Sequence, residues 1–420
     1  MKRYLHSLQG LGVLALGCVA FGAAAAPVEL IERGGVDAKA AAADPAWRAL
    51  AGNPATADIE LVAIKARAVD KRLDSLRLDL GGGLSLTAYR TDSYDTGTGA
   101  MVWSGVIAET STRVMPGVRN YLGEIEAPDD PMSSIILVRN GDKVTANIHA
   151  GGELLKIRPL HQGGHALVVA DKRRAPQDHP PEYAALPVIP MAVDKAAESK
   201  ANTVIRVMVN YTPSAASQSG DITGLINLAV AESNQGYANS GVGITMQLAN
   251  ASQVSYTETG NFTTDLNRYR GTSDGYMDSI HATRNSVAAD VGVLMVTNTA
   301  YCGLASGIGS TATTAFAEVY WDCATGYYSF AHEVGHLQSA RHDPANDPTN
   351  NPYRYGHGYQ YPAGGWRTIM AYQCSSTNCT RLNYWSNPSV TYGGVPMGTS
   401  TRSDNERVLN LTKGTVAAFR

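Results

Sequence analysis

Three histidines and a glutamate in the last third of the chain have the residue types and spacing of a metal-dependent hydrolytic site. His332 and His336 are four residues apart, so on a helix both side chains lie on one face and can bind one metal ion. Glu333 lies beside them and can approach the open side of that metal. His342 follows six residues after His336, a spacing that does not return to the same face of a straight helix. We therefore expect the helix to end near Ser339 and the chain to turn, so that His342 completes the site.

The chemistry expected from these residues is hydrolysis of a peptide bond. Three imidazoles leave one coordination position for water, which suits a single catalytic Zn²⁺ ion. Zinc lowers the pKa of that water and polarises a carbonyl, and Glu333 can take the proton and pass it to the leaving amine. Asp343 or Asp347 could also serve as the third ligand, but His342 has the better type and spacing. A glutamate a few turns downstream is a poor candidate, because the only later one is Glu406.

Two folded units must position these residues. The 420 residues exceed one typical core, and a composition of 44% hydrophobic and 17% charged residues is globular. Alternating segments predict a mostly β first unit, with strands at 84–89, 134–138, 143–148 and 154–157. The second unit has strand–helix alternation, which predicts an α/β fold with a largely parallel sheet. Its expected elements are strands at 204–209, 244–249, 291–296 and, as a possible edge strand, 315–320, with helices at 222–239 and around 278–288. Irregular structure is expected after residue 345.

The first residues predict secretion. Lys2 and Arg3 precede an apolar run at 11–21 and small residues at 23–26, which is the pattern of a signal peptide over residues 1–26. A membrane anchor and lipid attachment at Cys18 are the alternatives. No other apolar stretch is long enough to cross a bilayer, and a net charge of −3 gives no reason to expect nucleic acid or an anionic membrane as partner. The expected product is a secreted monomer that acts on protein or peptide substrates.

Four cysteines remain after the signal peptide, and an even count in an exported chain predicts two disulfides. Three pairings are possible. We favour Cys302–Cys323 and Cys374–Cys379, because each closes a local loop around the expected site. Between the two units, residues 171–200 contain five prolines and three consecutive basic residues. They predict an exposed linker that is open to proteolytic nicking. The expected divisions are therefore 1–26, 27–195 and 196–420.

The site motif resembles the metzincin signature, in which a turn containing methionine lies beneath the metal. Residues 368–372 are similar to that turn, so Met370 is expected as the apolar floor and Tyr372 as a stabiliser of the oxyanion. The blocks at 320–336, 355–359, 367–374 and 383–388 resemble the peptidyl-Asp metalloendopeptidases more closely, over the chain from about residue 204 onward. The resemblance implies a metzincin-like α/β (α+β) catalytic domain with a mixed, mostly parallel twisted sheet. It also implies zinc, secretion as a zymogen, and cleavage on the amino side of aspartate.

One residue departs from that pattern. Metzincins have glycine three residues after the second ligand, where the chain leaves the helix in a left-handed conformation, and here the residue is Ser339. A side chain there costs about 1–2 kcal/mol. Preference for aspartate also requires a cation in the substrate pocket, and arginine matches a carboxylate best. The candidates are Arg381, Arg367 and Arg354, of which we favour Arg381.

Residues 27–195 are expected to act as an inhibitory and folding propeptide. Residues 27–301 contain no cysteine, so a cysteine cannot block the metal, and a carboxylate or a backbone group remains as the blocking group. Self-processing before aspartate would occur at Val193–Asp194. Three other functions remain open: a metzincin-like endopeptidase of broader specificity, a non-catalytic adhesion or toxin-like protein on the same fold, and a metalloesterase or amidase. The sequence does not decide whether calcium binds.

Overall fold

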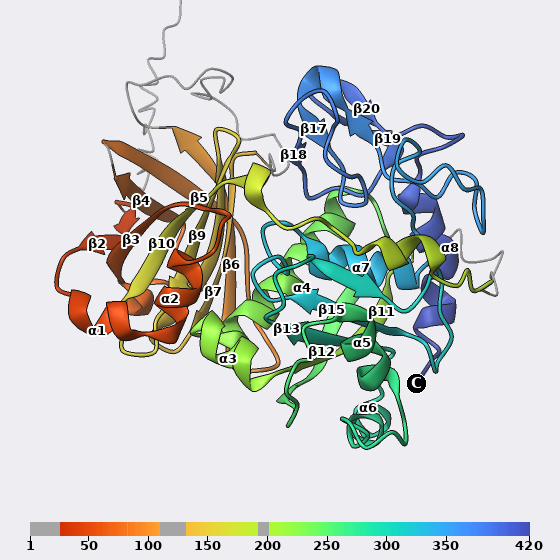
Figure 1. The fold of residues 1–420 in the computed structure, drawn as a ribbon. Coiled ribbons are helices and arrows are strands. Elements are labelled where there is room, and N and C mark those ends of the chain that lie inside the picture. The colour runs from red at the N-terminus through yellow and green to blue at the C-terminus, as the bar shows by residue number, and fades with distance from the viewer. Residues whose placement is uncertain (1–25, 82, 110–131, 192–200) are drawn as a thin grey trace, which may run out of the picture.

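The computed structural model describes residues 26–81, 83–109, 132–191 and 201–420, which form two units (Figure 1). The first is coloured red to yellow and the second green to blue. Nearly all of the expected signal peptide and the Val193–Asp194 bond lie outside the described residues. Among the described residues, no helix is both long enough and apolar enough to cross a membrane.

The N-terminal unit is a ten-stranded sheet with two short helices on it, α1 (Ala38–Ala43) and α2 (Pro45–Ala51). The strand order is β1-β4-β5-β6-β7-β8-β9-β10-β3-β2, and all neighbours are antiparallel except β1 and β4. The four expected strands lie within β5, β7, β8 and β9. The strands are β1 (Val28–Glu29), β2 (Ile31–Arg33), β3 (Thr56–Ile64), β4 (Ser75–Gly81), β5 (Leu84–Asp95), β6 (Met101–Glu109), β7 (Ser134–Asn140), β8 (Lys143–Ala150), β9 (Glu153–Pro159) and β10 (His165–Ala170).

The C-terminal unit has mixed α/β content, and its main sheet has the order β12-β11-β13-β15-β14. Its strands are β11 (Thr203–Tyr211), β12 (Ile244–Gln253), β13 (Val291–Val296), β14 (Gly303–Ala305) and β15 (Phe316–Tyr320). The first four in spatial order are parallel, and β14 is antiparallel to β15. The expectation of an edge strand at 315–320 is wrong, because the three-residue β14 pairs along the outer side of β15. So short a strand leaves no pattern in the sequence.

Six helices of the C-terminal unit cover this sheet: α3 (Pro213–Ser219), α4 (Ile222–Asn239), α5 (Phe262–Arg270), α6 (Ile280–Ser286), α7 (Ser329–Leu337) and α8 (Asn405–Val416). Small sheets join β16 (Gln360–Tyr361), β17 (Trp366–Arg367) and β18 (Thr380–Arg381), and β19 (Asn387–Tyr392) with β20 (Val395–Met397). The sequence did not predict α5 or α8. Irregular structure after residue 345 is therefore the wrong expectation for α8, which the side chain of Asp404 caps and whose Val408 and Leu409 are buried.

Helix α4 lies between the two units and is buried on almost every side. Leu225 and Ile226 belong to the main core beneath the parallel sheet, whereas Leu228 contacts Val102 and Val138 of the N-terminal sheet. A helix that is buried on all sides must be packed against other elements on all sides, and α4 contacts both units. The main core also runs on into the N-terminal unit, where Leu50, Leu154 and Val168 are among its members. The two units therefore share one hydrophobic core.

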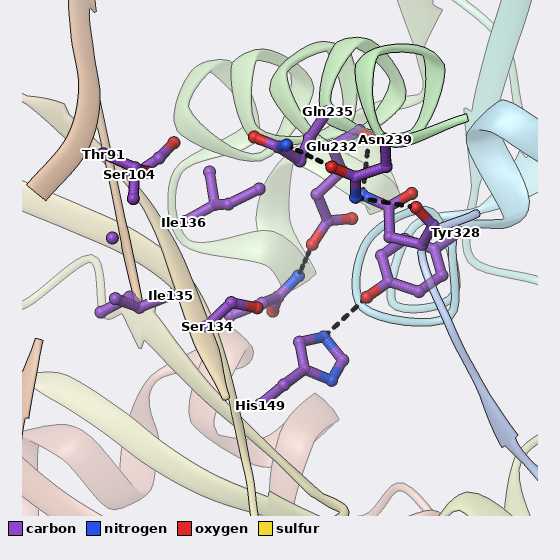
Figure 2. A pocket seen from close by; sticks show the side chains of 13 residues that line it. Thr91, Ser104, Ser134, Ile135, Ile136, His149, Glu232, Gln235, Asn239 and Tyr328 are labelled. Carbon is purple, nitrogen blue, oxygen red and sulfur yellow. Dashed lines mark hydrogen bonds between the residues drawn. The ribbon is translucent and has the colours of Figure 1, made fainter. Parts of the chain in front are cut away.

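The boundary between the units also contains buried polar groups around a cavity of about 20 Å³ (Figure 2). Glu232 of α4 accepts hydrogen bonds from Asn147 Nδ2 at 2.5 Å and from the Gly326 backbone N–H at 2.9 Å. The Tyr328 hydroxyl lies 2.9 Å from Nε2 of His149. Burial raises the pKa of Glu232 to about 7, because the charged form is disfavoured away from water.

That raised pKa predicts how a Glu232→Gln variant should respond to pH. A carboxyl with a pKa of 4.5 when unfolded and about 7 when folded favours folding below pH 4.5 and loses that contribution as the pH rises through 7. The free energy of unfolding of the variant, relative to the unmodified protein, should therefore rise by on the order of 2–3 kcal/mol between pH 4.5 and 8. Urea unfolding of both proteins across this range measures the difference, in which the titration of His149 and other common groups cancels. A difference that does not change with pH would contradict the raised pKa.

Candidate metal centre and active site

Helix α7 presents His332, Glu333 and His336 together at the centre of the C-terminal unit. All nine of its residues are buried, and it packs against β14 and β15. The i, i+4 spacing places the two imidazoles one above the other on a single face. The orientation of both rings is fixed by a hydrogen bond from Nδ1 to a backbone carbonyl. His332 Nδ1 donates to the Ile369 carbonyl at 2.9 Å, and His336 Nδ1 donates to the Ala340 carbonyl at 2.8 Å. In each ring, Nε2 is therefore left without a proton.

The Nε2 atom of His342 lies close to the Nε2 atoms of both other histidines. Nε2 of His342 lies 3.1 Å from Nε2 of His332 and 3.1 Å from Nε2 of His336. Two ligands at a tetrahedral zinc are about 3.3 Å apart, so this donor set fits such an ion. Burial lowers the pKa of all three histidines, and the neighbouring imidazoles lower it further. Neutral imidazoles with converging lone pairs repel one another unless a cation lies between them, so the chemistry of the donors indicates a metal site.

His342 reaches this point through a turn at Ser339. The helix ends at Leu337, and Ser339 has a φ of 73°, the left-handed conformation that the sequence pattern predicts there. Arg341 then pairs with the backbone of the 356–358 segment: its N–H donates to Gly356 at 2.7 Å, and its carbonyl accepts from Gly358 at 2.9 Å. These bonds fix the chain on both sides of the turn, which places His342.

A Ser339→Gly variant should be more stable than the unmodified protein. Glycine removes the left-handed cost of about 1–2 kcal/mol but adds about 0.4–1 kcal/mol of chain entropy in the unfolded state, so a net gain of about 0.5–1 kcal/mol is expected. The melting temperature should rise by ~2 °C. Ser339→Ala is the matched control, since it removes the buried, unpartnered hydroxyl but keeps the Cβ atom. A gain from alanine equal to that from glycine would show that the hydroxyl, and not the backbone, is the source of strain.

Glu333 faces the histidine cluster from the same helix turn. The Glu333 carboxylate fits here because residue 303 of β14 is a glycine: a Cβ atom on Gly303 would lie 2.5 Å from Glu333 Oε1. Burial raises the pKa of the Glu333 carboxyl to about 8. A cation at the centre of the histidines would lower that pKa again, as is needed for a base.

The structure places Met370 against helix α7 and Tyr372 beside His342. Met370 is fully buried, and its Sδ atom is 3.2 Å from the position that a Cβ atom on Gly335 of α7 would take. The ring of Tyr372 lies 4.1 Å from that of His342, and its backbone N–H donates to Asp343 at 3.0 Å. Burial raises the pKa of Tyr372, so its hydroxyl remains a donor.

A fourth histidine, which the sequence did not predict, completes the cluster. His179 belongs to the crossing segment, residues 171–191, which leaves β10 and runs across the C-terminal unit in front of α7 (Figure 1). One ring nitrogen of each of His179, His332, His336 and His342 lies within 4.8 Å of the others. His179 Nε2 is 3.0 Å from Glu333 Oε1, and its Nδ1 is 3.1 Å from the Tyr372 hydroxyl.

The expectation of an exposed linker is therefore wrong for part of this segment, because His179 is only 6% exposed. Its tie to the C-terminal unit is a run of backbone hydrogen bonds. The carbonyls of Gln177 and Asp178 accept from Cys302 and Gly303 at 2.8 and 3.1 Å, and further along the Ile189 N–H donates to Ile308 at 2.8 Å. Both isolated bridges, at 177–301 and 188–308, are parallel.

Asp178 lies between two of the three candidate arginines. Its Oδ2 is 2.6 Å from Arg381 Nη2 and 3.7 Å from Arg367 Nη1. Burial alone would raise the pKa of Asp178, but the two guanidinium groups hold it below its ordinary value. Arg367 and Arg381 are register partners in the β17–β18 pair, so their like charges lie side by side and favour an anion between them. Arg354 is exposed and lies away from this place.

A cavity of about 390 Å³ lies against Asp178, Arg367 and Arg381, beside the histidine cluster. Two disulfides hold its walls, and they are the pairs favoured from the sequence. Cys302–Cys323 joins the start of β14 to the segment before α7, and Cys374–Cys379 closes the loop between Tyr372 and β18. The arrangement combines a metal site, a carboxylate base and a cationic pocket. Of the other aspartates considered as ligands, Asp343 supports Tyr372, and Asp347 accepts from Arg341 at 2.8 Å.

Comparison with known proteins gives a consistent picture. A family model described as Metallo-peptidase family M12 matches residues 201–386. A protein of Stenotrophomonas maltophilia (strain R551-3) named peptidyl-Asp metalloendopeptidase is 53% identical, over 97% of this chain and 98% of its own length. One of the same name from Xanthomonas campestris pv. campestris is 50% identical over 98% of each chain, and one from Pseudomonas fragi is 51% identical over 45% of this chain and all of its own. With such identity over nearly its whole length, the chain belongs to the peptidyl-Asp metalloendopeptidases and is a metalloendopeptidase.

Proposed function

We propose that this protein is a zinc-dependent endopeptidase, secreted as a zymogen, that cleaves peptide bonds on the amino side of aspartate. The observation that carries the specificity is Asp178, whose carboxylate lies 2.6 Å from Arg381 beside the histidine cluster. A carboxylate bound there is a model for the aspartate of a substrate, because the pocket recognises the side chain and not the chain that carries it. The names of the relatives support the same substrate class.

His332, His336 and His342 would hold the zinc ion, which when bound supplies a Lewis acid and lowers the pKa of a water molecule. Glu333 takes a proton from the attacking water and delivers it to the amine of the departing aspartate. The Tyr372 hydroxyl donates to the oxygen of the scissile carbonyl as negative charge develops on it. Arg381 and Arg367 hold the aspartate carboxylate and so fix which peptide bond lies at the histidines.

Secretion and processing are part of the same proposal. The basic and apolar pattern of residues 1–26 supports export, and the placement of the crossing segment against Glu333 supports a latent form. Residues 27–195 would then be the propeptide and residues 196–420 the mature enzyme.

Mapping of cleavage sites by mass spectrometry tests the function directly. The activated enzyme is incubated with a denatured protein mixture, beside Glu333→Gln protein purified in the same way. New peptides should begin with aspartate, and the variant should produce none. Cleavage without an aspartate preference would indicate a metzincin-like endopeptidase of broader specificity. Absence of cleavage by both proteins would favour a binding protein or an enzyme that acts on esters or amides.

A further inference from the structure

The crossing segment brings an acidic residue and a histidine to the active site as neighbours in sequence, Asp178 on the two arginines and His179 in the histidine cluster. The His179 side chain is 1% exposed, and its ring centroid lies 4.6–5.0 Å from those of His332, His336 and His342. One ring nitrogen of His179 and one of each of the three other histidines all lie within 4.8 Å of one another, so His179 is close enough to share a metal with them. Three protein ligands leave one position at a catalytic zinc, and His179 is the group beside it.

We propose that Asp178 and His179 together keep the zymogen latent, with His179 as the fourth metal ligand and Asp178 occupying the aspartate pocket. Each of the two residues occupies a position that a reacting group needs, the attacking water or the substrate carboxylate. His179 takes the position of the attacking water and also contacts the Glu333 carboxylate, at 3.0 and 3.2 Å. Asp178 takes the place of the substrate carboxylate between Arg381 and Arg367.

The direction of the chain explains why the enzyme does not cut this segment, an argument that rests on the proposed cleavage before aspartate. In a substrate, the carbonyl at the metal belongs to the residue before the aspartate. In the crossing segment, the residue at the histidines is His179, which comes after Asp178. The bond that would be cut, between Gln177 and Asp178, is instead held against the edge of the C-terminal unit, where the Gln177 carbonyl accepts from the Cys302 N–H. Asp178 therefore fills the pocket without presenting a cleavable bond to the metal.

Tyr183 fixes the crossing segment on the C-terminal side of His179. Its ring lies 4.1 Å from that of His342 and 5.1 Å from that of His336, and its hydroxyl donates to Asp347 at 3.0 Å. The segment is thus fixed both before and after His179, which lowers the entropy cost of holding that side chain at the metal.

Coordination can be measured without measuring activity. The full chain carrying Glu333→Gln, which prevents self-cleavage, is loaded with Co²⁺ and titrated with azide, an anion that binds an open coordination position and changes the visible spectrum. If His179 fills the fourth position, azide should leave the spectrum of this zymogen unchanged and should shift that of the mature domain. An equal response of both forms would overturn the proposal, and this comparison needs no change at His179.

Variants at His179 sharpen the test. His179→Gln keeps the size and polarity of the side chain but is a poor ligand, so its Co²⁺ spectrum should respond to azide. With Glu333 intact, it should convert to the mature enzyme at least tenfold faster than the unmodified zymogen. His179→Asp and His179→Cys restore a ligand and should restore slow conversion. His161→Gln, at an exposed histidine of the same unit, is the matched control and should behave as the unmodified chain. Slow conversion of His179→Gln would overturn the role of His179.

Asp178→Asn separates the role of Asp178 in the arginine pocket from the role of His179 at the metal. This variant keeps His179 but removes the charge that the arginines bind, so its Co²⁺ spectrum should stay insensitive to azide while its conversion is accelerated. Conversion at the unmodified rate would overturn the role of Asp178. The azide result depends only on the metal, so it stands even if cleavage-site mapping shows no preference for aspartate, and the two proposals can fail separately.

Discussion

Replacement of Arg381 by alanine is expected to lower kcat/KM for peptides with aspartate after the scissile bond by on the order of 10²–10³-fold, because one partner of a buried ion pair is lost. Arg381 is 5% exposed and has Asp178 at 2.6 Å, whereas Arg367 is 3.7 Å from the same carboxylate and is not expected to hold it alone. The variant should cut aspartate peptides and their alanine counterparts at similar rates. Paired peptides that differ only at this residue measure the change.

The controls follow from what else Arg381 contacts. It also donates to the carbonyls of Tyr327 and Ala371 at 3.0 and 3.1 Å, so its loss could loosen the loop after Met370. Metal content and melting temperature of each variant separate that effect from lost recognition. Arg381→Lys retains the charge without the fork and should keep an intermediate preference. Arg354→Ala should change nothing, because that arginine is exposed and lies away from Asp178. An aspartate preference that survives in Arg381→Ala rejects the assignment of the pocket.

Glu333→Gln is expected to lower kcat by on the order of 10³–10⁴-fold, with KM and metal content almost unchanged. Glutamine has the same size but cannot take a proton, so the variant loses the general base while the ligands on α7 stay in place. Steady-state kinetics with a single aspartate peptide give kcat and KM separately, and metal analysis confirms the loading.

A buried glutamate elsewhere is the matched comparison for this variant. Glu232 is 3% exposed, yet it lies at the boundary with the N-terminal unit and not at the histidines. In the mature enzyme, Glu232→Gln should keep kcat within a few-fold of the unmodified value. A Glu333→Gln enzyme that retained more than a tenth of its activity would show that another group is the base.

The sequence could predict that these histidines come together, because the information for it is local. Two histidines at i, i+4 define one helix face whatever surrounds the helix, and the six-residue spacing to His342 requires a turn that Ser339 makes with a φ of 73°. The resemblance to known enzymes added Met370 and Tyr372, which the structure places against α7 and beside His342. Helix α8 could also have been found, since Asp404 is a capping residue and Val408 and Leu409 begin an apolar face.

The blocking group that we propose could not be predicted from the sequence, because the position of His179 is not set by local sequence. His179 lies in a segment rich in proline and charge, which by itself indicates an exposed linker. Its place in the cluster depends on backbone pairing with the edge beside β14, a three-residue strand with no pattern of its own. From the sequence we expected a carboxylate or a backbone group to block the metal, whereas the structure leads us to propose a histidine. Asp178 followed by His179 in a segment without cysteine was the available signal, and a single such dipeptide is weak.

The core that the two units share has a consequence for the lifetime of the mature enzyme. Leu50, Leu154 and Val168 cover apolar residues of the C-terminal unit, so the proposed release of the N-terminal unit would expose surface that was buried while the chain folded. The mature domain would then retain a structure for which the complete chain was the template. Once unfolded, such a domain would lack the surface on which it folded, so we expect its persistence to depend on the height of its unfolding barrier. If the proposed processing occurs, a single cleavage would thus give the enzyme a finite working life.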